Sequence, residues 1–434
     1  MKRRLPFAGV IAIGLVLGLM GSALAAVTWG AQSAIPGAYT WNYSNSMDFH
    51  GTPGAAGFRL DEAFISDNTL PEAVHYTRKS ATGAWSAPVK VSGDKNADGS
   101  SLASAGNTII VGWQTGYTYY DADGTARNLQ ISVSQDGGST WGNIKNLTST
   151  TGFIDYPIVA ASKTTFGPIN LYVAWVNSTN GKVQFREKSG SGIWSPTVTL
   201  GTTTHTDASG YLGYANIAAT GNLITVAWIA DDTGQVKARA INLSTATAAA
   251  TLSNWPAAVS LTGKISIAQN GFPIVSASRL VPDLTTIAWN TDTAQVVSTY
   301  DGSTIDTTPA TVFTDGSANG VTYAGGYSLA VEPAPGGFVA MWAGCVDTNL
   351  TNDCDYGAKA ARFDLLSSTS TDASTWSTTP TLVASSTVTH QPLNDEASIV
   401  ALSGGTTYAQ YNAYTASYSY YDTFLRIGTG SYAP

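Results

Sequence analysis

The sequence predicts an all-β fold, a β-propeller built from four-stranded antiparallel blades. Two observations carry this prediction: tryptophans recur at regular steps along the chain, and short apolar runs bounded by turn residues recur with them. Ten of the twelve Trp residues fall into two interleaved series. The first series ends apolar runs, with steps of 62, 53, 61 and 53 residues, at Trp113, Trp175, Trp228, Trp289 and Trp342.

The second Trp series follows turns rich in Ser, Gly and Thr. Its members are Trp85, Trp141, Trp194, Trp255 and Trp376. The first three steps are 56, 53 and 61 residues, and the last is 121, about two repeats. We therefore expect one repeat to lack its Trp near Thr307.

Each repeat reads as four short strands. The runs are rich in β-branched and aromatic residues and are separated by Gly or Asn turns, which is typical of strands, and no window of helical length shows a 3.6-residue stripe. Representative strands are predicted at 156–162, 214–221, 272–278 and 397–404 (first), 129–134 and 182–187 (third), and 196–201 (fourth).

The number of blades depends on two weaker versions of the Trp-ending strand. One is the Tyr-rich run 406–414, and the other is the Phe version 60–66. Counting both gives seven blades, with the last blade closed by an N-terminal strand from within 27–46. The alternative is six blades, with 27–70 decorating the surface. We favour seven, in a single domain over 26–434.

The turn at 134–141 reads Ser-Gln-Asp-Gly-Gly-Ser-Thr-Trp. A carboxylate in such a turn accepts hydrogen bonds from backbone N–H groups, and Gly permits positive φ. The turn therefore predicts a structural staple made by Ser134, Asp136, Gly138, Thr140 and Trp141.

This turn resembles the Asp-box, the bacterial neuraminidase repeat S-x-D-x-G-x-T-W, and degenerate copies stand at 80–85, 189–194 and 370–376. The resemblance implies a sialidase-like propeller in which the boxes are structural and lie opposite the ligand site. It also implies a hydrolase with three carboxylate-binding Arg residues, the first in an F/Y-R-I-P motif. The nearest match, Phe58-Arg59-Leu60-Asp61, lacks the Pro, and no motif supports Arg279 and Arg426 as its partners. Catalytic residues stay unknown, and enzyme activity stays open.

Propeller geometry brings the loops between strands two and three, and between blades, to the face opposite the Asp-boxes. These loops are rich in Tyr, Asp and Asn, which suits carbohydrate because rings pack on sugar C–H faces and polar groups bind hydroxyls. Alternatively, the Tyr residues only cover the last blade and the His residues are solvated. The candidate ligand-binding residues are Tyr418, Tyr420, Tyr421, Asp422, His205, Asp207, His390, Asp395 and Glu396.

Asp94, Asn96 and Asp98 match the first half of an EF-hand-type loop, which makes Ca²⁺ the one cofactor to consider. The twelfth position is Ala105, where such a loop needs a bidentate Glu. A plain Asx turn is the alternative interpretation.

The chain start predicts export. A Lys-Arg-Arg start, an apolar run and an A-x-A site make a secretory signal peptide over 1–25, with cleavage after Ala25. We therefore expect a secreted, periplasmic or cell-surface protein with no transmembrane segment after cleavage. In that compartment Cys345 and Cys354, nine positions apart, predict a disulfide; free thiols or metal ligation are the alternatives.

Charge excludes nucleic acid and anionic membrane as partners. The net charge is −8, and removing Lys2, Arg3 and Arg4 makes it −11. The sequence thus predicts an exported propeller that binds a glycan or an extracellular protein. A sialidase-like glycoside hydrolase is the second hypothesis, and a structural cell-envelope component is the third.

Overall fold

The computed structural model describes residues 27–35, 46–53, 55–66, 72–93, 96–115, 128–148, 154–164, 167–206, 214–246, 248–266, 271–346, 362–385, 398–402, 405–414 and 421–430. The signal peptide predicted over 1–25 lies outside these residues.

The strands form antiparallel sheets in which consecutive strands pair. Sheet 1 holds β3 (Ser46–His50), β4 (Arg59–Ser66), β5 (Ala73–Ser80) and β6 (Val89–Lys90). Sheet 2 holds β7 (Ala97–Ala105), β8 (Thr108–Thr115), β9 (Asn128–Ser134) and β10 (Lys145–Asn146). Sheet 3 holds β11 (Ile154–Lys163), β12 (Ile169–Asn177), β13 (Lys182–Ser189) and β14 (Val198–Thr202). Sheet 4 holds β15 (Ala215–Thr220), β16 (Leu223–Ile229), β17 (Val236–Asn242) and β18 (Val259–Ser260).

The remaining sheets follow the same order. Sheet 5 holds β19 (Ile274–Ala277), β20 (Thr285–Asn290), β21 (Ala294–Tyr300) and β22 (Ala310–Thr314). Sheet 6 holds β23 (Gly316–Ala318), β24 (Val321–Ala334), β25 (Gly337–Val346), β26 (Arg362–Ser370) and β27 (Thr381–Ser385). Sheet 7 holds β28 (Ser398–Ala401), β29 (Thr406–Tyr414) and β30 (Tyr421–Thr429), completed by β1 (Thr28–Trp29) and β2 (Ser33–Ala34).

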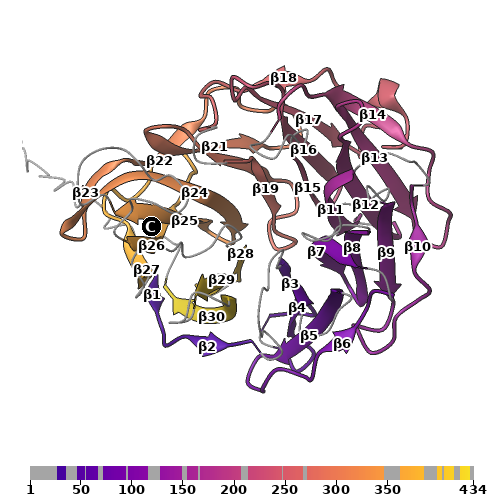
Figure 1. Cartoon of the computed structure of the whole chain (residues 1–434), viewed down its shortest axis with the longest axis horizontal. Helices are drawn as coiled ribbons and strands as arrows, with labels where there is room; N and C mark the ends of the chain where they lie inside the picture. The colour runs from indigo at the N-terminus through magenta and orange to yellow at the C-terminus, as the bar shows by residue number, and fades with distance from the viewer. Residues whose placement is uncertain are drawn as a thin grey trace, which may run out of the picture.

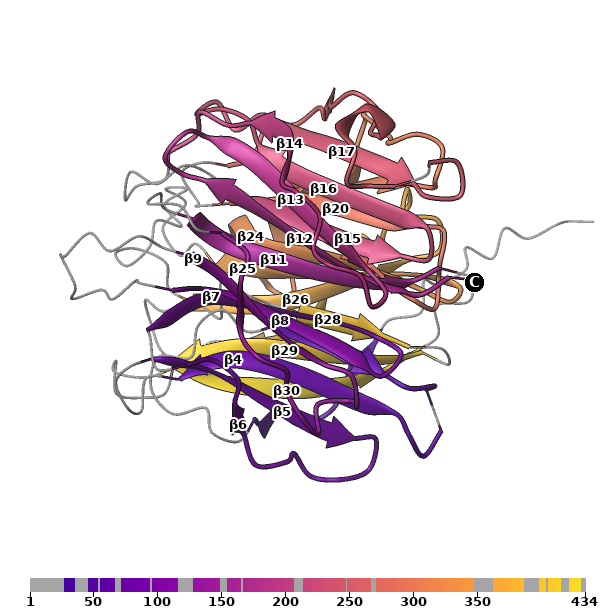
Figure 2. The same ribbon diagram turned by 90° about the vertical axis from the view of Figure 1, so that its right-hand side faces the viewer.

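The sheets are arranged around one axis as the blades of a propeller (Figure 1). Their innermost strands contact one another in the order β3, β7, β11, β15, β19, β24 and β28, and β28 contacts β3. This closes the ring, and the side view shows the sheets stacked obliquely beside one another (Figure 2). The prediction of an all-β propeller with four-stranded antiparallel blades is confirmed.

The described strands form seven sheets. The Phe version at 60–66 lies in β4 and the Tyr version at 406–414 is β29, so both belong to sheets of the ring. The N-terminal strands β1 and β2 pair with β30, at Thr28 with Thr429 and Ser33 with Leu425. Residues 46–66 therefore build sheet 1 instead of decorating the surface.

The core lies between the sheets. Seven apolar clusters each join two neighbouring sheets; for example, Val111 and Trp113 of sheet 2 pack with Ala63 and Val74 of sheet 1. The first Trp series lies on the second strands and is buried, since Trp113, Trp175, Trp228, Trp289 and Trp342 are at most 1% exposed. Because each cluster needs both neighbours, closing the ring stabilises every sheet.

The repeat that lacks a Trp has Ile305 in its place. Ile305 forms a bridge to Tyr300, as Trp376 does to Ser370 and Trp85 does to Lys79. The position at which this repeat lacks its Trp, predicted near Thr307, is therefore Ile305.

Helix is scarce in the described ranges, where a single 3₁₀ turn, η1 (Leu252–Asn254), is present. Those ranges contain no helix of a length and hydropathy that would cross a membrane.

Candidate functional site

The ring has two faces, which we name by their residues. The turn face carries the turns between third and fourth strands, with Asp136, Asp301 and Asp372. The loop face is the opposite end, where first strands begin near Gly99, Tyr156, Tyr214 and Phe272.

On the turn face, Asp136 is the centre of the turn at 134–141. Its carboxylate accepts hydrogen bonds from Thr140 Oγ1 (2.6 Å), Thr140 N (2.8 Å), Ser134 Oγ (2.8 Å) and Ser139 N (3.0 Å). These bonds, those from Thr140 above all, lower the pKa of Asp136 to about 2. These hydrogen bonds all lie within the turn, which supports the structural interpretation.

Two further turns repeat the arrangement. The carboxylate of Asp372 accepts from Ser374 N at 2.9 Å and Thr375 N at 2.7 Å. Asp301 accepts from Ser303 N at 3.0 Å and Thr304 N at 3.3 Å. The turn at Asp301 was not recognised in the sequence because Ile305 replaces the Trp; the run Asp-Gly-Ser-Thr is the signal that identifies it.

The turn at 134–141 packs on a buried polar network in sheet 1. His50 Nδ1 lies 2.5 Å from Asp61 Oδ2, and Tyr76 Oη donates to Asp61 Oδ1 at 2.5 Å. Burial raises the pKa of Asp61, against the hydrogen bond from His50 that lowers it. A Cβ on Gly138 would lie 2.3 Å from Tyr76 Oη, so Gly138 allows the turn to sit directly on this network. All three side chains are buried, which excludes contact with a large ligand.

On the loop face, three aromatic side chains form a continuous arc across sheets 3, 4 and 5. Tyr156 and Tyr214 have ring centroids 5.2 Å apart with 43° between their planes. Tyr214 and Phe272 are 5.5 Å apart at 39°. All three rings are half-buried, so part of each reaches the surface. We call Tyr156, Tyr214 and Phe272 the aromatic arc.

Backbone irregularity gathers at the same ends of the first strands. The β11–β12 register shifts between Asp155 and Ile158, and Tyr156 has a φ of 36°, which is uncommon for a bulky residue. The β7–β8 register shifts between Asp98 and Ser101, and Gly99 has a φ of 59°. Bulges re-aim side chains and are frequent beside functional sites, and strained residues cluster there. The backbone beside the arc therefore shows register shifts and positive φ values, which are frequent beside functional sites.

The aromatic arc has the chemistry of a stacking surface. Because neighbouring rings touch, they present one strip of aromatic surface with no gap between rings. Such a strip packs against flat apolar faces, including the C–H faces of sugars, while Tyr hydroxyls add hydrogen-bonding groups.

Of the candidate ligand residues on the loop face, His205 has a described side chain. It is buried, with Nδ1 3.2 Å from Asp232 Oδ1, and Asp232 also accepts from Thr206 N at 2.9 Å. The alternative interpretation of His205 as a solvated loop residue is wrong, because its side chain is buried.

The roles of the other candidate ligand residues stay predictions. Tyr421 and Asp422 begin β30, where their backbone is described. Outside the described residues lie Asp207, His390, Asp395, Glu396, Tyr418 and Tyr420.

In the described part of the proposed calcium loop, the side-chain oxygens of Asn96 and Asp98 accept hydrogen bonds from other groups of the protein. Asn96 Oδ1 accepts from Glu72 N at 3.1 Å, and Asp98 accepts from Gly99 N and Gln114 Nε2, both at 2.8 Å. Asp94 lies outside the described residues. Among those described, His, Cys, Asp and Glu nowhere gather in a group of three that would hold a metal.

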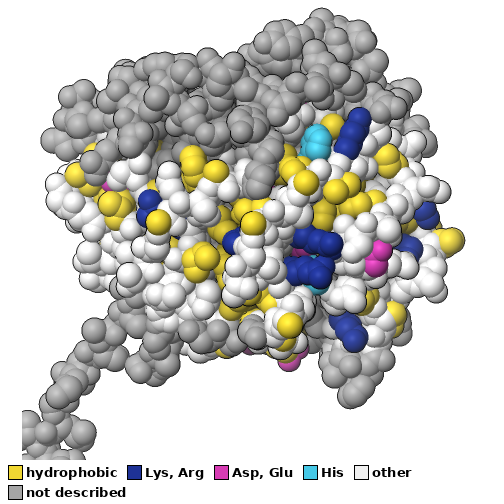
Figure 3. Space-filling view, turned by 90° about the horizontal axis from the view of Figure 1, so that it is seen from below, with side chains coloured by type: hydrophobic (Ala, Val, Ile, Leu, Met, Phe, Trp, Pro, Cys, Tyr) yellow, Lys and Arg dark blue, Asp and Glu magenta, His cyan; other side chains and the backbone are white. Residues whose placement is uncertain are grey.

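Two of the three arginines considered for a sialidase-type clamp bond to different partners. Arg279 Nη2 donates to Asp48 Oδ1 at 2.7 Å, and Arg426 Nε donates to Tyr411 Oη at 3.2 Å. Arg59 begins β4 and pairs in register with His50. Figure 3 shows several Lys and Arg side chains gathered on the surface that is seen from below.

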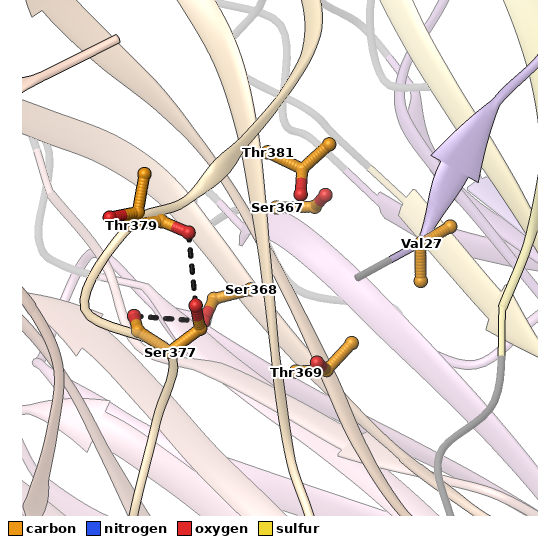
Figure 4. Close-up of a pocket in the computed structure, with 7 residues that line it drawn as sticks. All are labelled: Val27, Ser367, Ser368, Thr369, Ser377, Thr379 and Thr381. Atoms are coloured by element: carbon orange, nitrogen blue, oxygen red, sulfur yellow. Dashed lines mark hydrogen bonds between the residues drawn. The ribbon is translucent and has the colours of Figure 1, made fainter. Parts of the chain in front are cut away.

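A small cavity lies where the N-terminal strand meets sheet 6 (Figure 4). Its volume is about 10 Å³, room for one water-sized molecule. Ser377 Oγ donates to Thr379 O at 3.0 Å beside it, and Val27, Ser367 and Thr381 also line it. This cavity is too small for a sugar.

Cys345 is buried in β25, and Cys354 lies outside the described residues. The disulfide between them stays a prediction.

Neither protein-family models nor curated proteins match this sequence. Solved structures do share part of its fold. A Trypanosoma rangeli sialidase in complex with sialic acid is 13% identical, with a TM-score of 0.41, over 80% of this chain and 55% of that chain. A fucose-specific lectin from Aleuria aurantia is 12% identical, with a TM-score of 0.44, over 80% of this chain and 98% of that chain. The chain thus spans about half of the sialidase.

A second structure of the fungal lectin is described as a six-bladed β-propeller with a fucose recognition mode. It is 13% identical, with a TM-score of 0.44, over 79% of this chain and 95% of that one. These similarities concern the propeller fold, and the sheet count of this chain rests on its own strand pairing.

The sequence pattern predicted Tyr156, Tyr214 and Phe272 as the first residues of first strands. The sequence does carry a signal for the arc, because each of three first strands begins with an aromatic residue. The three starts read Tyr-Pro-Ile at 156, Tyr-Ala-Asn at 214 and Phe-Pro-Ile at 272. Alignment of the first strands, in addition to the Trp strands, would have identified the arc.

Proposed function

We propose that this protein is an exported, seven-bladed Asp-box propeller that binds a glycan through the aromatic arc on its loop face. The observation that carries the proposal is the contact of Tyr214 with both Tyr156 and Phe272, which makes one partly buried aromatic strip from three sheets. Seven sheets in a closed cycle support the blade count.

We expect the ligand to be a neutral glycan. An anionic sugar is bound most strongly by a cation, and Arg is the side chain suited to bidentate recognition of a carboxylate. Arg279, which follows first strand β19, is committed to Asp48 and Ser104. Asp232, whose side chain is 65% exposed, adds negative charge beside His205 and Thr206.

A glycan array followed by calorimetric titration of the strongest neutral ligand tests the proposal. Loss of a stacking ring costs about 1 kcal/mol, so Tyr214→Ala should weaken binding about fivefold or more. Tyr214→Phe keeps the ring and should retain most of the affinity. Ile193→Ala removes a 91% exposed apolar side chain from a turn of the opposite face and serves as the control.

The second hypothesis, a sialidase-like hydrolase, is tested with a fluorogenic sialoside in the same preparation. Turnover that is lost in Arg59→Ala or Arg279→Ala and kept in Tyr214→Ala would replace the binding proposal. An extracellular protein as ligand is favoured instead if no glycan binds and Tyr214→Ala disrupts capture of one defined secreted partner.

Export is part of the proposal. N-terminal sequencing of the protein from its native host should begin at Ala26, and an intact Met1 on the mature protein would contradict the signal peptide.

A further inference from the structure

The aromatic arc ends on its sheet 2 side at Gly99. This residue lies near the start of first strand β7, beside the start of first strand β11 that carries Tyr156. A Cβ on Gly99 would lie 2.9 Å from Tyr156 Cδ1 and 3.3 Å from Tyr156 Cα. The first distance is shorter than packed carbon atoms tolerate, so any side chain at position 99 would displace the ring or the strand that carries it.

The two strands are fixed to each other around this contact. Asp98 Oδ1 accepts from Gly99 N at 2.8 Å, and Asp98 Oδ2 accepts from Gln114 Nε2 at 2.8 Å. Immediately beyond the two bulges, Val159 N donates to Ser101 Oγ at 2.7 Å. The irregular backbone at Gly99 is therefore held from both sides, by its own sheet and by its neighbour.

We propose that Gly99 is a positioning residue for the ligand site. The Tyr156 ring lies in the space that a side chain at position 99 would fill, and Asp98 holds the backbone of Gly99 in place. The ring then presents one orientation at the end of the arc. The consequence for ligand affinity rests on the proposed glycan-binding function, whereas the coupling between Gly99 and Tyr156 does not.

Gly106 provides a matched control on the same strand pair. It follows β7 at the turn face, has a φ of 58° against 59° for Gly99, and a Cβ there would meet Ile169 Cδ1 at 3.3 Å. Alanine at either position bears a similar backbone penalty. Only alanine at position 99 meets Tyr156.

The first experiment needs no ligand. Thermal unfolding is measured for Gly99→Ala, Gly106→Ala, Tyr156→Ala and both double variants. We expect Tyr156→Ala to restore part of the melting temperature lost in Gly99→Ala, because it removes the clashing ring, and not to restore that lost in Gly106→Ala. Additive losses in both pairs would overturn the proposal.

The second experiment titrates the array-selected glycan into the same variants. Gly99→Ala and Tyr156→Ala should each weaken binding about fivefold, their double variant should lose no more than either, and Gly106→Ala should bind within twofold of the wild type. Equal affinity of Gly99→Ala and Gly106→Ala would refute the positioning role. If the wild type binds no glycan, the proposed function fails while the unfolding data still decide the coupling.

Discussion

Arg279 Nη2 lies 2.7 Å from Asp48 Oδ1, although these residues are 231 positions apart in the chain. The same nitrogen donates to Ser104 O at 2.7 Å and Ser104 Oγ at 2.9 Å, and the guanidinium lies 4.2 Å from the ring centroid of Phe49. Sheet 5 is thereby joined to sheets 1 and 2, which are not its neighbours in the ring. One side chain therefore links opposite parts of the propeller.

We predict that Arg279→Ala lowers the free energy of unfolding by about 2 kcal/mol, because it leaves Asp48 without its cation in a partly buried setting. Urea unfolding measures this loss. Arg279→Lys should recover only part of it, since one ammonium does not reproduce the planar guanidinium. Lys90→Ala, at an exposed position of β6, should change stability by less than about 0.5 kcal/mol. An equal effect of Arg279→Ala and Lys90→Ala would contradict the bridging role.

Glu332 on β24 lies near this bridge. Burial raises the pKa of Glu332 well above 4.5, with a further rise from Asp48 and an opposing decrease from Arg279. Because the folded-state pKa exceeds the unfolded value, the folded protein loses stability as the pH rises above that unfolded value.

We therefore predict that Glu332→Gln is more stable than the wild type at neutral pH and that this gain disappears as the pH falls to about 4. Chemical unfolding of both proteins at several pH values tests it. A stability difference that does not change with pH would show that Glu332 does not titrate as described.

The contact between the turn at 134–141 and the Tyr76 network gives a third prediction. Gly138 has a φ of 77°, and a Cβ there would lie 2.3 Å from Tyr76 Oη; Gly320 has a φ of 78° and nothing within 4 Å. Gly320→Ala should therefore show the backbone cost alone, about 1 kcal/mol, whereas Gly138→Ala should cost at least about 2 kcal/mol more. Similar melting temperatures for the two variants would mean that the turn does not rest on Tyr76.

The disulfide gives a fourth prediction. Mass spectrometry of the exported protein without reductant should show Cys345 and Cys354 bonded and no alkylatable thiol. Closing so short a loop stabilises the fold by about 2–3 kcal/mol, so reductant should lower the melting temperature. Two alkylatable thiols in the native protein would refute the bond.

The repeat pattern predicted the fold because each repeat carries its own strand and turn signals within a short stretch of sequence. Trp113 and its four equivalents mark second strands, since a large apolar residue recurs wherever two sheets must pack together. The arc was not predicted, because Tyr156, Tyr214 and Phe272 resemble ordinary strand residues until the ring of sheets brings them together. The Arg279–Asp48 contact could not be predicted, since no local spacing relates positions 231 residues apart.

A crystal structure of the protein with the strongest glycan from the array tests the central claim most directly. We predict a sugar ring whose C–H face packs on Tyr214, with Tyr156 or Phe272 also in contact, and no ligand on the turn face. A glycan bound away from the arc, or held by converging Arg side chains, would contradict the account.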